Sequence, residues 1–264
     1  MDLNSTLKDL LDKPKEKPGS PFMGLVISMV NDHTSTVATR KVIKSIQDTK
    51  SDIMPFIMPA TTPATLNQDL LLFGKTLDDW SYPKSPAEKR FDLKSGLTLS
   101  GYNAKDYTKV VSCMVSHMRA WFASAMVGEG RPIIVLEHDA IFTRQFKSAD
   151  FPTTGGGIIG LNDPRGATRK SGIYYDKVIN SVGDEIYPHI KPAPMVDEEN
   201  VPQGLAGNSA YIIYPKAARH MLDLVSKYGL WPNDALMCNQ LVPYLKHTYP
   251  FYTALQGVQS TTQG

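Results

Sequence analysis

Two carboxylates and an imidazole stand together at Glu137-His138-Asp139, directly after the apolar run 133–136. A short, fully apolar run of this kind is typical of a strand buried in the middle of a sheet. On an extended segment, side chains two residues apart point the same way, so Glu137 and Asp139 would face one side. Paired carboxylates suit a hard divalent cation such as Mg²⁺ or Mn²⁺. Ordinary solvated acids at a strand end are the alternative, and the spacing by itself does not decide.

The place of these residues in the chain favours a ligand site. Ligands of open α/β sheets bind beyond the carboxyl ends of the strands. A cation held there could bridge a diphosphate and neutralise the charge that develops as it leaves. His138 would point to the side opposite the two acids, and we expect it to be structural or a hydrogen-bonding partner rather than a metal ligand.

The hydrophobic pattern around the motif predicts an α/β fold. Apolar runs at 23–30 and 53–58 favour strands, and the stretch between them favours a helix, which together make a βαβ unit. Apolar residues recur every three or four positions over 104–127 and indicate a long amphipathic helix. Further expected elements are strands at 158–161 and 210–214, a helix from Pro215 to Tyr228 ended by Gly229, and a helix opened by residues 231–234 with Asn233 as a candidate cap.

We therefore expect a single α/β domain over residues 21–264, with a mostly parallel central sheet flanked by helices. Residues 1–20 are interpreted as a peripheral helix followed by a tether. The stretch 59–103, which is punctuated by prolines, is interpreted as a surface excursion over the active site. Residues 162–203, rich in Gly, Pro and charge, predict a long loop with a small hairpin, and the last 20 residues are expected to wrap the surface.

The helix that precedes the motif carries further residues that form a pattern with it. Cys113, Ser116-His117 and Trp121 lie on that helix, and the strand ending in 137–139 follows after a short turn. This arrangement resembles glycosyltransferase family 25, the group of bacterial lipopolysaccharide-biosynthesis galactosyltransferases and the collagen galactosyltransferase domain. The family pattern is a Cys, a Ser-His pair, an aromatic residue and a strand ending in Leu-Glu-Asp-Asp. Here a histidine replaces the first Asp, whereas the outer Glu and the last Asp are kept.

The resemblance extends over about residues 23–261 but is dense only within 113–142 and 207–234. Weaker landmarks are the small-residue turn and Ala-Tyr strand at 207–211, the Ala-rich helix start at 215–218, the pair Asn233-Asp234, the segment 249–251 and the tail Ser260-Thr261.

The resemblance implies a GT-A fold, a nucleotide-diphosphate sugar donor with UDP-sugar preferred, and transfer with inversion. Asp139 would then hold Mn²⁺ or Mg²⁺, with Glu137 assisting directly or through water. Asp234 is the candidate general base for the acceptor hydroxyl, because the free amides in the first turn of a helix hold a carboxylate in place. A simple capping acid is the alternative for Asp234.

Nucleotide binding is expected in two places. In this fold, the end of the first strand, from Ser28 to Asp32, contacts the base and ribose. The match at Ser116-His117 implies a hydrogen-bond donor to the diphosphate or nucleotide, whereas a satisfied core histidine is the alternative. The glycines at 155–157 could cradle a phosphate, but a flexible loop is favoured because no helix start follows them.

Composition and hydrophobicity restrict the classes of partner and the cellular compartment that we expect for this protein. The net charge of +2 at pH 7 does not suggest a protein that coats nucleic acid. The sequence contains no run of about 18 apolar residues that could span a membrane, and its polar N-terminus lacks the apolar centre of a signal peptide. Cys113 and Cys238 are too few for a disulfide framework, so we expect reduced thiols in the cytoplasm of a bacterium or a phage-infected host.

The acceptor is left open by the sequence. The family default is a hydroxyl of a surface glycan, such as the lipopolysaccharide core. The alternative is DNA, as in bacteriophage enzymes that add sugars to 5-hydroxymethylcytosine. It is favoured by a loop in which Arg165, Arg169 and Lys170 lie near Tyr174 and Tyr175, although a solvated loop is the preferred interpretation of that segment. A non-catalytic relative that binds a nucleotide sugar or a glycan is a third hypothesis, because the middle acid of the motif is a histidine.

Overall fold

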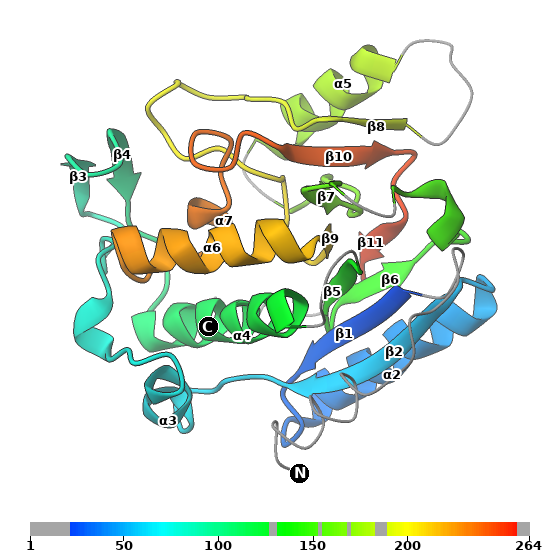
Figure 1. Ribbon diagram of the computed structural model, residues 1–264, viewed down its shortest axis with the longest axis horizontal. Coiled ribbons are helices and arrows are strands. Elements are labelled where there is room, and N and C mark those ends of the chain that lie inside the picture. Colours follow the sequence, from blue (N-terminus) through cyan, green and yellow to red (C-terminus); the bar gives the residue numbers. More distant parts are fainter. Residues whose placement is uncertain (1–21, 127–130, 153–154, 168–169, 183–188, 258–264) are drawn as a thin grey trace.

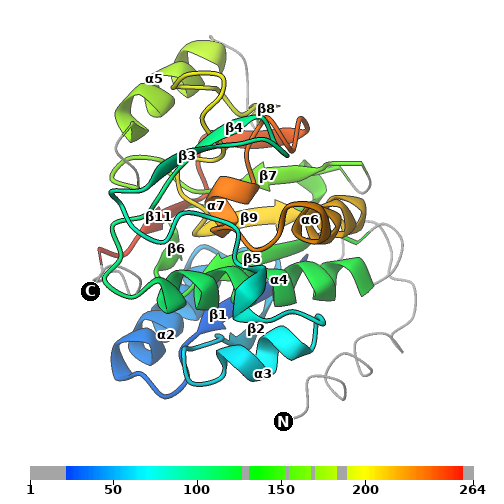
Figure 2. The same ribbon diagram turned by 90° about the vertical axis from the view of Figure 1, so that its left-hand side faces the viewer.

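The computed structural model describes residues 22–126, 131–152, 155–167, 170–182 and 189–257. The predicted helix and tether at 1–20, Arg169 and the Ser260-Thr261 tail lie outside the described residues. Over the described part, seven strands form one mixed sheet with helices on both faces (Figures 1 and 2). The predicted α/β fold with flanking helices is therefore confirmed. No helix in this part of the chain has the length and hydrophobicity of a bilayer-spanning segment.

The strand order of the sheet is β2-β1-β5-β9-β7-β10-β8. The bounds of these strands, in the same order, are β2 (Ile53–Pro59), β1 (Phe22–Ser28), β5 (Ile133–Glu137), β9 (Ala210–Ile213), β7 (Ile158–Gly160), β10 (Leu245–Tyr249) and β8 (His189–Pro192). β2, β1 and β5 are parallel neighbours, and β7 is parallel to β10. β9 runs antiparallel to both β5 and β7, and β8 runs antiparallel to β10. Five of the seven strands thus run in the same direction and β8 and β9 run opposite to them, so the sheet is mixed, with three parallel and three antiparallel neighbour pairs.

Side-chain alternation in the strands supplies two hydrophobic cores. On β1, Leu25 belongs to the core beneath α4 (Tyr107–Met126) and α6 (Pro215–Tyr228), whereas Val26 belongs to the core beneath α2 (His33–Asp48). Successive strand residues face opposite sides of a sheet, so the same strands hold both layers together. The long helices α4 and α6 therefore lie on one face, and α2 covers the other (Figure 1).

The bounds of α6 agree with the punctuation in the sequence. The helix begins at Pro215, whose missing N–H costs nothing in the first turn. Gly229 follows the last helical residue with a φ of +88°, a left-handed conformation that glycine adopts without a Cβ clash. Both ends of this helix are therefore local properties of the chain.

Residues 59–103 are only in part the predicted surface excursion. They form the short helix α3 (Leu66–Leu71), the 3-10 turn η1 (Leu77–Asp79) and a hairpin of β3 (Lys89–Asp92) and β4 (Leu97–Ser100). Six side chains of this stretch are buried in the core beneath α4 and α6, namely Leu66, Leu70, Trp80, Tyr82, Leu97 and Leu99. They come from a six-residue helix, a turn and a four-residue strand, so their spacing gave only a weak periodic signal.

Two further predictions are wrong. Residues 162–203 contain helix α5 (Ser171–Val182) and the sheet strand β8, rather than a long loop with a small hairpin. Buried side chains recur every four residues along α5 from Tyr174 onward, but the helix is short and flanked by Gly, Pro and charge. The last residues do not simply wrap the surface, because β10 lies within the sheet. β11 (Thr253–Leu255) pairs with β6 (Ala140–Phe142).

The glycines at 155–157 precede strand β7 instead of a helix. A Cβ on Gly156 would overlap the ring of Tyr214, and one on Gly157 would lie 2.8 Å from the backbone oxygen of Tyr244. These glycines therefore permit close packing at the start of a strand. That position is at the edge of the sheet opposite the carboxyl end of β5, so it does not favour the phosphate cradle.

Candidate active site

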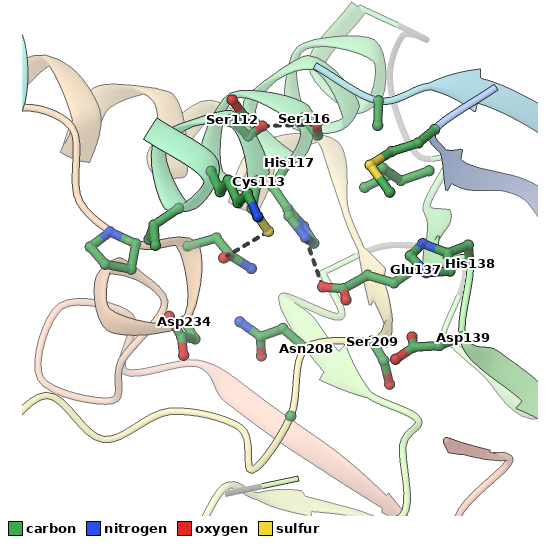
Figure 3. Close-up of a pocket in the computed structure, with 18 of the residues that line it drawn as sticks. Ser112, Cys113, Ser116, His117, Glu137, His138, Asp139, Asn208, Ser209 and Asp234 are labelled. Carbon is green, nitrogen blue, oxygen red and sulfur yellow. Dashed lines mark hydrogen bonds and ion pairs between the residues drawn. The ribbon is translucent and has the colours of Figure 1, made fainter. Parts of the chain in front are cut away.

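A cavity of about 840 Å³ lies at the edge of the sheet where β1 and β5 end. Its lining comes from the end of β5, the residue that caps α2, the first half of α4, residues 207–209 and α7 (Asn233–Leu236). In the view of Figure 3, Asn208 projects between Asp234 and Glu137. Acids from distant parts of the chain therefore share one cavity.

The antiparallel direction of β9 brings these segments together. An antiparallel neighbour begins where β5 ends, so the turn 207–209 that leads into β9 meets the acids at the end of β5. Leu136 is paired with Ala210, and the Glu137 N–H donates to the Ser209 carbonyl at 2.7 Å. The turn is thus fixed to the motif by the sheet itself.

Glu137 is held by a chain of buried hydrogen bonds. The Trp121 indole N–H lies 2.8 Å from the Tyr211 hydroxyl, which lies 2.8 Å from His117 Nδ1, and His117 Nε2 lies 3.1 Å from Glu137 Oε1. An indole N–H can only donate, so the Tyr211 oxygen accepts from it and the Tyr211 O–H donates to Nδ1. His117 Nε2–H then donates to Glu137, a direction assigned from the network because it satisfies every donor. The Glu137 side chain remains 31% exposed and reaches the cavity.

The electrostatics of Glu137 and Asp139 differ. Burial opposes ionisation of Glu137, but the hydrogen bond from His117 outweighs it and holds the pKa of Glu137 below the usual range. Burial, together with the negative charge of Glu137, raises the pKa of Asp139 to about 7. Asp139 Oδ1 is buried and has no hydrogen-bond partner within the described ranges. A divalent cation would supply both the missing partner and the missing positive charge.

His138 does not point away from the acids as expected. Strand β5 ends at Glu137, and residues 138–139 form a turn into β6 rather than an extended segment. Strand alternation therefore does not apply, and His138 lines the same cavity as Glu137 and Asp139. Burial lowers the pKa of His138 although the charges of Glu137 and Asp32 oppose it, so the imidazole is neutral at pH 7.

Asp234 lies in the first turn of α7 and lines the cavity, as expected of the candidate base. Its Oδ1 accepts the Ala235 N–H at 3.0 Å, and its carboxylate is hydrogen-bonded by Tyr102. Burial nevertheless raises the pKa of Asp234. Asn233 does not cap the helix as predicted, because its Oδ1 instead accepts a weak bond from the Cys113 thiol at 3.8 Å.

Asp32 and Ser28, the residues predicted to contact the nucleotide, have different surroundings. Asp32 caps α2 by accepting the Ser35 N–H at 2.7 Å, and it also lines the cavity. Ser28 is buried on the α2 side of the sheet, where its Oγ accepts from the Thr39 hydroxyl at 2.7 Å. The structure thus leaves Asp32 available to a ligand and favours a packing role for Ser28.

Ser116 and His117 border the cavity, but their polar atoms already have partners. Ser116 Oγ donates to the Ser112 carbonyl at 2.9 Å and accepts the Thr61 N–H at 2.9 Å. Both ring nitrogens of His117 are engaged by Tyr211 and the motif glutamate. The structure therefore favours the satisfied core histidine, which would act on a ligand only by orienting that glutamate.

A second group of potential ligands is formed by Cys113, His117 and Glu137, whose ligand atoms lie within 4.8 Å of one another. Such a set would suit a softer metal such as Zn²⁺. Burial raises the pKa of the Cys113 thiol well above its usual range, and the thiol donates to Asn233. Because the Cys113 thiol and both ring nitrogens of His117 are already hydrogen-bonded to other protein atoms, this group is a poor candidate for a metal site.

The basic loop that favoured a DNA acceptor is largely neutralised by its neighbours. Arg165 is paired with Asp163 at 2.6 Å, and Lys170 is paired with Asp197 at 2.6 Å. Tyr174, one of the two tyrosines of this loop, is only 3% exposed. The described part of the loop is therefore a poor phosphate-binding surface.

No family model matches the chain, and no curated protein matches it. The proposed function therefore depends on the side chains of the cavity. Among these, Tyr102 was missed because it ends a stretch without periodicity. Asn208 and Ser209 served only as landmarks of the resemblance, because polar residues ahead of a strand are common in any loop.

Proposed function

We propose that this protein is a metal-dependent glycosyltransferase of the GT-A type that transfers a sugar from a nucleotide-diphosphate donor to an acceptor hydroxyl, inverting the anomeric centre. One observation carries the proposal. A single cavity contains two acids suited to a cation, Glu137 and Asp139, and a third acid suited to be a base, Asp234. The resemblance over 113–142 supports the same activity.

Asp139 would hold Mn²⁺ or Mg²⁺, with Glu137 assisting. The donor atoms are carboxylate oxygens, which hard cations prefer, and the buried, partnerless Oδ1 of Asp139 fits that role. When bound, the cation would neutralise the charge that develops on the departing diphosphate. The hydrogen bond from His117 holds Glu137 in one orientation, so this part of the site is organised before the donor binds.

Asp234 would accept the proton of the acceptor hydroxyl. The acceptor oxygen then forms a bond to the anomeric carbon, the bond from that carbon to the diphosphate oxygen breaks, and the nucleoside diphosphate leaves. The raised pKa of Asp234 brings the base closer to the working pH, where a general base is most effective. The Ala235 N–H and the Tyr102 hydroxyl orient its carboxylate.

The nucleotide would lie beyond the carboxyl end of β1, where Asp32 lines the cavity. This is the edge at which open α/β sheets bind ligands, and a carboxylate there is suited to accept hydrogen bonds from ribose hydroxyls. UDP-sugars are the first donors to test.

A panel of nucleotide sugars tests the proposal, with release of the free nucleoside diphosphate as the readout in Mn²⁺, in Mg²⁺ and in EDTA. We expect turnover of at least one donor only when metal is present. Asp139→Ala should lower that turnover by about 100-fold or more. Asp223→Ala, which removes an exposed acid from α6, is the matched control and should retain full turnover.

Three outcomes would contradict parts of the proposal. Unchanged turnover in Asp139→Ala would refute the metal assignment. Turnover that persists in EDTA would refute metal dependence. A wild-type protein that binds nucleotides but turns over no donor would favour the non-catalytic binding relative, in which His138 has displaced an acid that catalysis requires.

We propose a glycan hydroxyl as the acceptor, because the loop that favoured DNA has its described cations paired with acids. Binding of duplex DNA containing 5-hydroxymethylcytosine tests the alternative. Affinity that is measurable at about 50 mM salt and falls steeply with added salt would support the DNA acceptor instead. The absence of binding at that salt concentration would leave the glycan.

A further inference from the structure

Two buried polar side chains on the turn before β9 are without hydrogen-bond partners in the described chain. Asn208 is 6% exposed and Ser209 is 4% exposed. The Nδ2 and Oδ1 atoms of Asn208 and the Oγ of Ser209 are all buried and unpaired. Native proteins pair nearly all such groups, so three unpaired atoms on adjacent residues indicate a ligand.

Both side chains line the cavity that contains the three acids. Figure 3 shows the Asn208 amide projecting into the space between Asp234 and Glu137. The Ser209 backbone carbonyl accepts the Glu137 N–H at 2.7 Å, so this turn lies directly beside the proposed metal site.

The turn is held in a fixed place by close packing. Gly207 has a φ of +92°, and a Cβ at this position would lie 2.8 Å from the side chain of Ala167 and 2.9 Å from that of Asn162. Only glycine fits this approach without displacing its neighbours. Asn208 and Ser209 are therefore presented to the cavity by a rigid element rather than by a loose loop.

The chemistry of these groups selects a neutral, hydroxyl-bearing ligand. A carboxamide has two N–H donors and an acceptor oxygen, and a serine hydroxyl both donates and accepts. An anion could satisfy only the donors, and it would also be repelled by Asp234 and Glu137. Hydroxyl groups donate and accept, so a ring with several hydroxyls satisfies all the unpaired atoms.

We infer that Asn208 and Ser209 form the subsite for the hydroxyl groups of the donor sugar, an inference that rests on the proposed function. The subsite lies between two parts of the cavity. On one side are Glu137 and Asp139, which would hold the cation and through it the diphosphate. On the other is Asp234, which would activate the acceptor. The transferred sugar must occupy that interval, because it is bonded to the diphosphate and attacked from the side of the base. Asn208 and Ser209 are thus specificity-determining residues.

The test compares binding of nucleoside diphosphates with binding of the matching nucleotide sugars. Calorimetric titrations in Mn²⁺, without acceptor, use UDP with UDP-glucose and UDP-galactose first, then the GDP, ADP, CDP and dTDP pairs. We expect Asn208→Ala to weaken nucleotide-sugar binding by about 10-fold and Ser209→Ala by about 5-fold. Binding of the free nucleoside diphosphate should change by less than about twofold, because its atoms do not reach the turn.

Asn200→Ala is the control, because it removes an exposed amide whose Nδ2 donates to the Thr98 hydroxyl, away from the cavity lining. Thermal melts of each variant check folding, and the unpaired state of Asn208 predicts no loss of stability in Asn208→Ala. If that variant does not fold, Ser209→Ala and Asn208→Ser carry the same comparison.

The outcomes separate the inference from the function on which it rests. Equal weakening of nucleotide and nucleotide sugar in Asn208→Ala, or no weakening of either, overturns the sugar subsite while the proposed function stands. An effect seen only as a raised KM for the acceptor overturns it as well, because these hydroxyls would then belong to the acceptor. A wild-type protein that binds neither nucleotides nor nucleotide sugars overturns the proposed function and the subsite together.

Discussion

Replacing Tyr211 with phenylalanine removes a single hydroxyl that two buried groups use. The hydroxyl accepts from the Trp121 indole N–H and donates to His117 Nδ1, both at 2.8 Å. Trp121, His117 and Tyr211 are each 0% exposed, so water cannot replace the lost oxygen. The substitution keeps the ring, and its effect should therefore come from the hydrogen bonds alone.

The expected loss of stability follows from counting the groups left behind. Each buried polar group that loses its partner costs about 1–3 kcal/mol, so two such groups cost about 2–6 kcal/mol. For a chain of this size the lower limit corresponds to a fall in Tm of at least about 4 °C. Urea unfolding followed by tryptophan fluorescence, together with a thermal melt, measures both quantities.

Tyr174→Phe is the matched control. Tyr174 is also buried, at 3% exposed, but its hydroxyl has no partner among the described residues. Deleting an unpaired buried hydroxyl should be neutral or slightly stabilising. If Tyr211→Phe destabilises no more than Tyr174→Phe, the chain that orients Glu137 does not exist as described.

Three further predictions concern the site and its supports. The raised pKa of Asp139, about 7, means that the folded protein keeps a proton that the unfolded chain loses near pH 4. The free energy of unfolding of the metal-free protein should therefore fall as pH rises from about 4 to about 7. Asp139→Asn should flatten that decline, as measured by urea unfolding. The affinity for Mn²⁺, measured by calorimetry, should rise over the same pH interval. Arg119→Met should cost about 3 kcal/mol in urea unfolding because it leaves a largely buried carboxylate unpaired. Lys44→Met is the control, because the ion pair of Lys44 with Asp48 is exposed, and its free energy of unfolding should change by less than about 0.5 kcal/mol. Equal losses of stability in Arg119→Met and Lys44→Met would contradict this reasoning. Both Gly207 and Gly166 have positive φ, but only at Gly207 would a Cβ meet other atoms within 4 Å. Thermal melts should therefore show Gly207→Ala to be the more destabilising, and an equal or reversed order would mean that the turn is not tightly packed.

Much of the fold could be predicted because its signals are local. The apolar run before Glu137 gave strand β5, and the three-to-four spacing over 104–127 gave α4. Proline and glycine gave both ends of α6. Short elements without a full period could not be found in this way. α5 and α3 were missed because their buried side chains are few and their flanks are polar.

The site was only partly predictable for a different reason. The alternation that placed Glu137 and Asp139 on one side holds along an extended strand, whereas the chain turns immediately after Glu137. His138 consequently joins the cavity lining. Backbone direction at a strand end depends on what the next element pairs with, and residue spacing carries no information about that pairing.

The sequence by itself determined that an acidic motif ends a buried strand, that a carboxylate at 234 opens a helix, and that a long helix precedes the motif. Only the tertiary structure decided that these groups share a cavity. The deciding feature is the antiparallel entry of β9, which brings Asn208 and Ser209 to the end of β5. An apolar run shows that a strand is buried but not in which direction it runs. The contacts that organise Glu137, Asp234 and the turn therefore arise from long-range pairing, which local patterns do not encode.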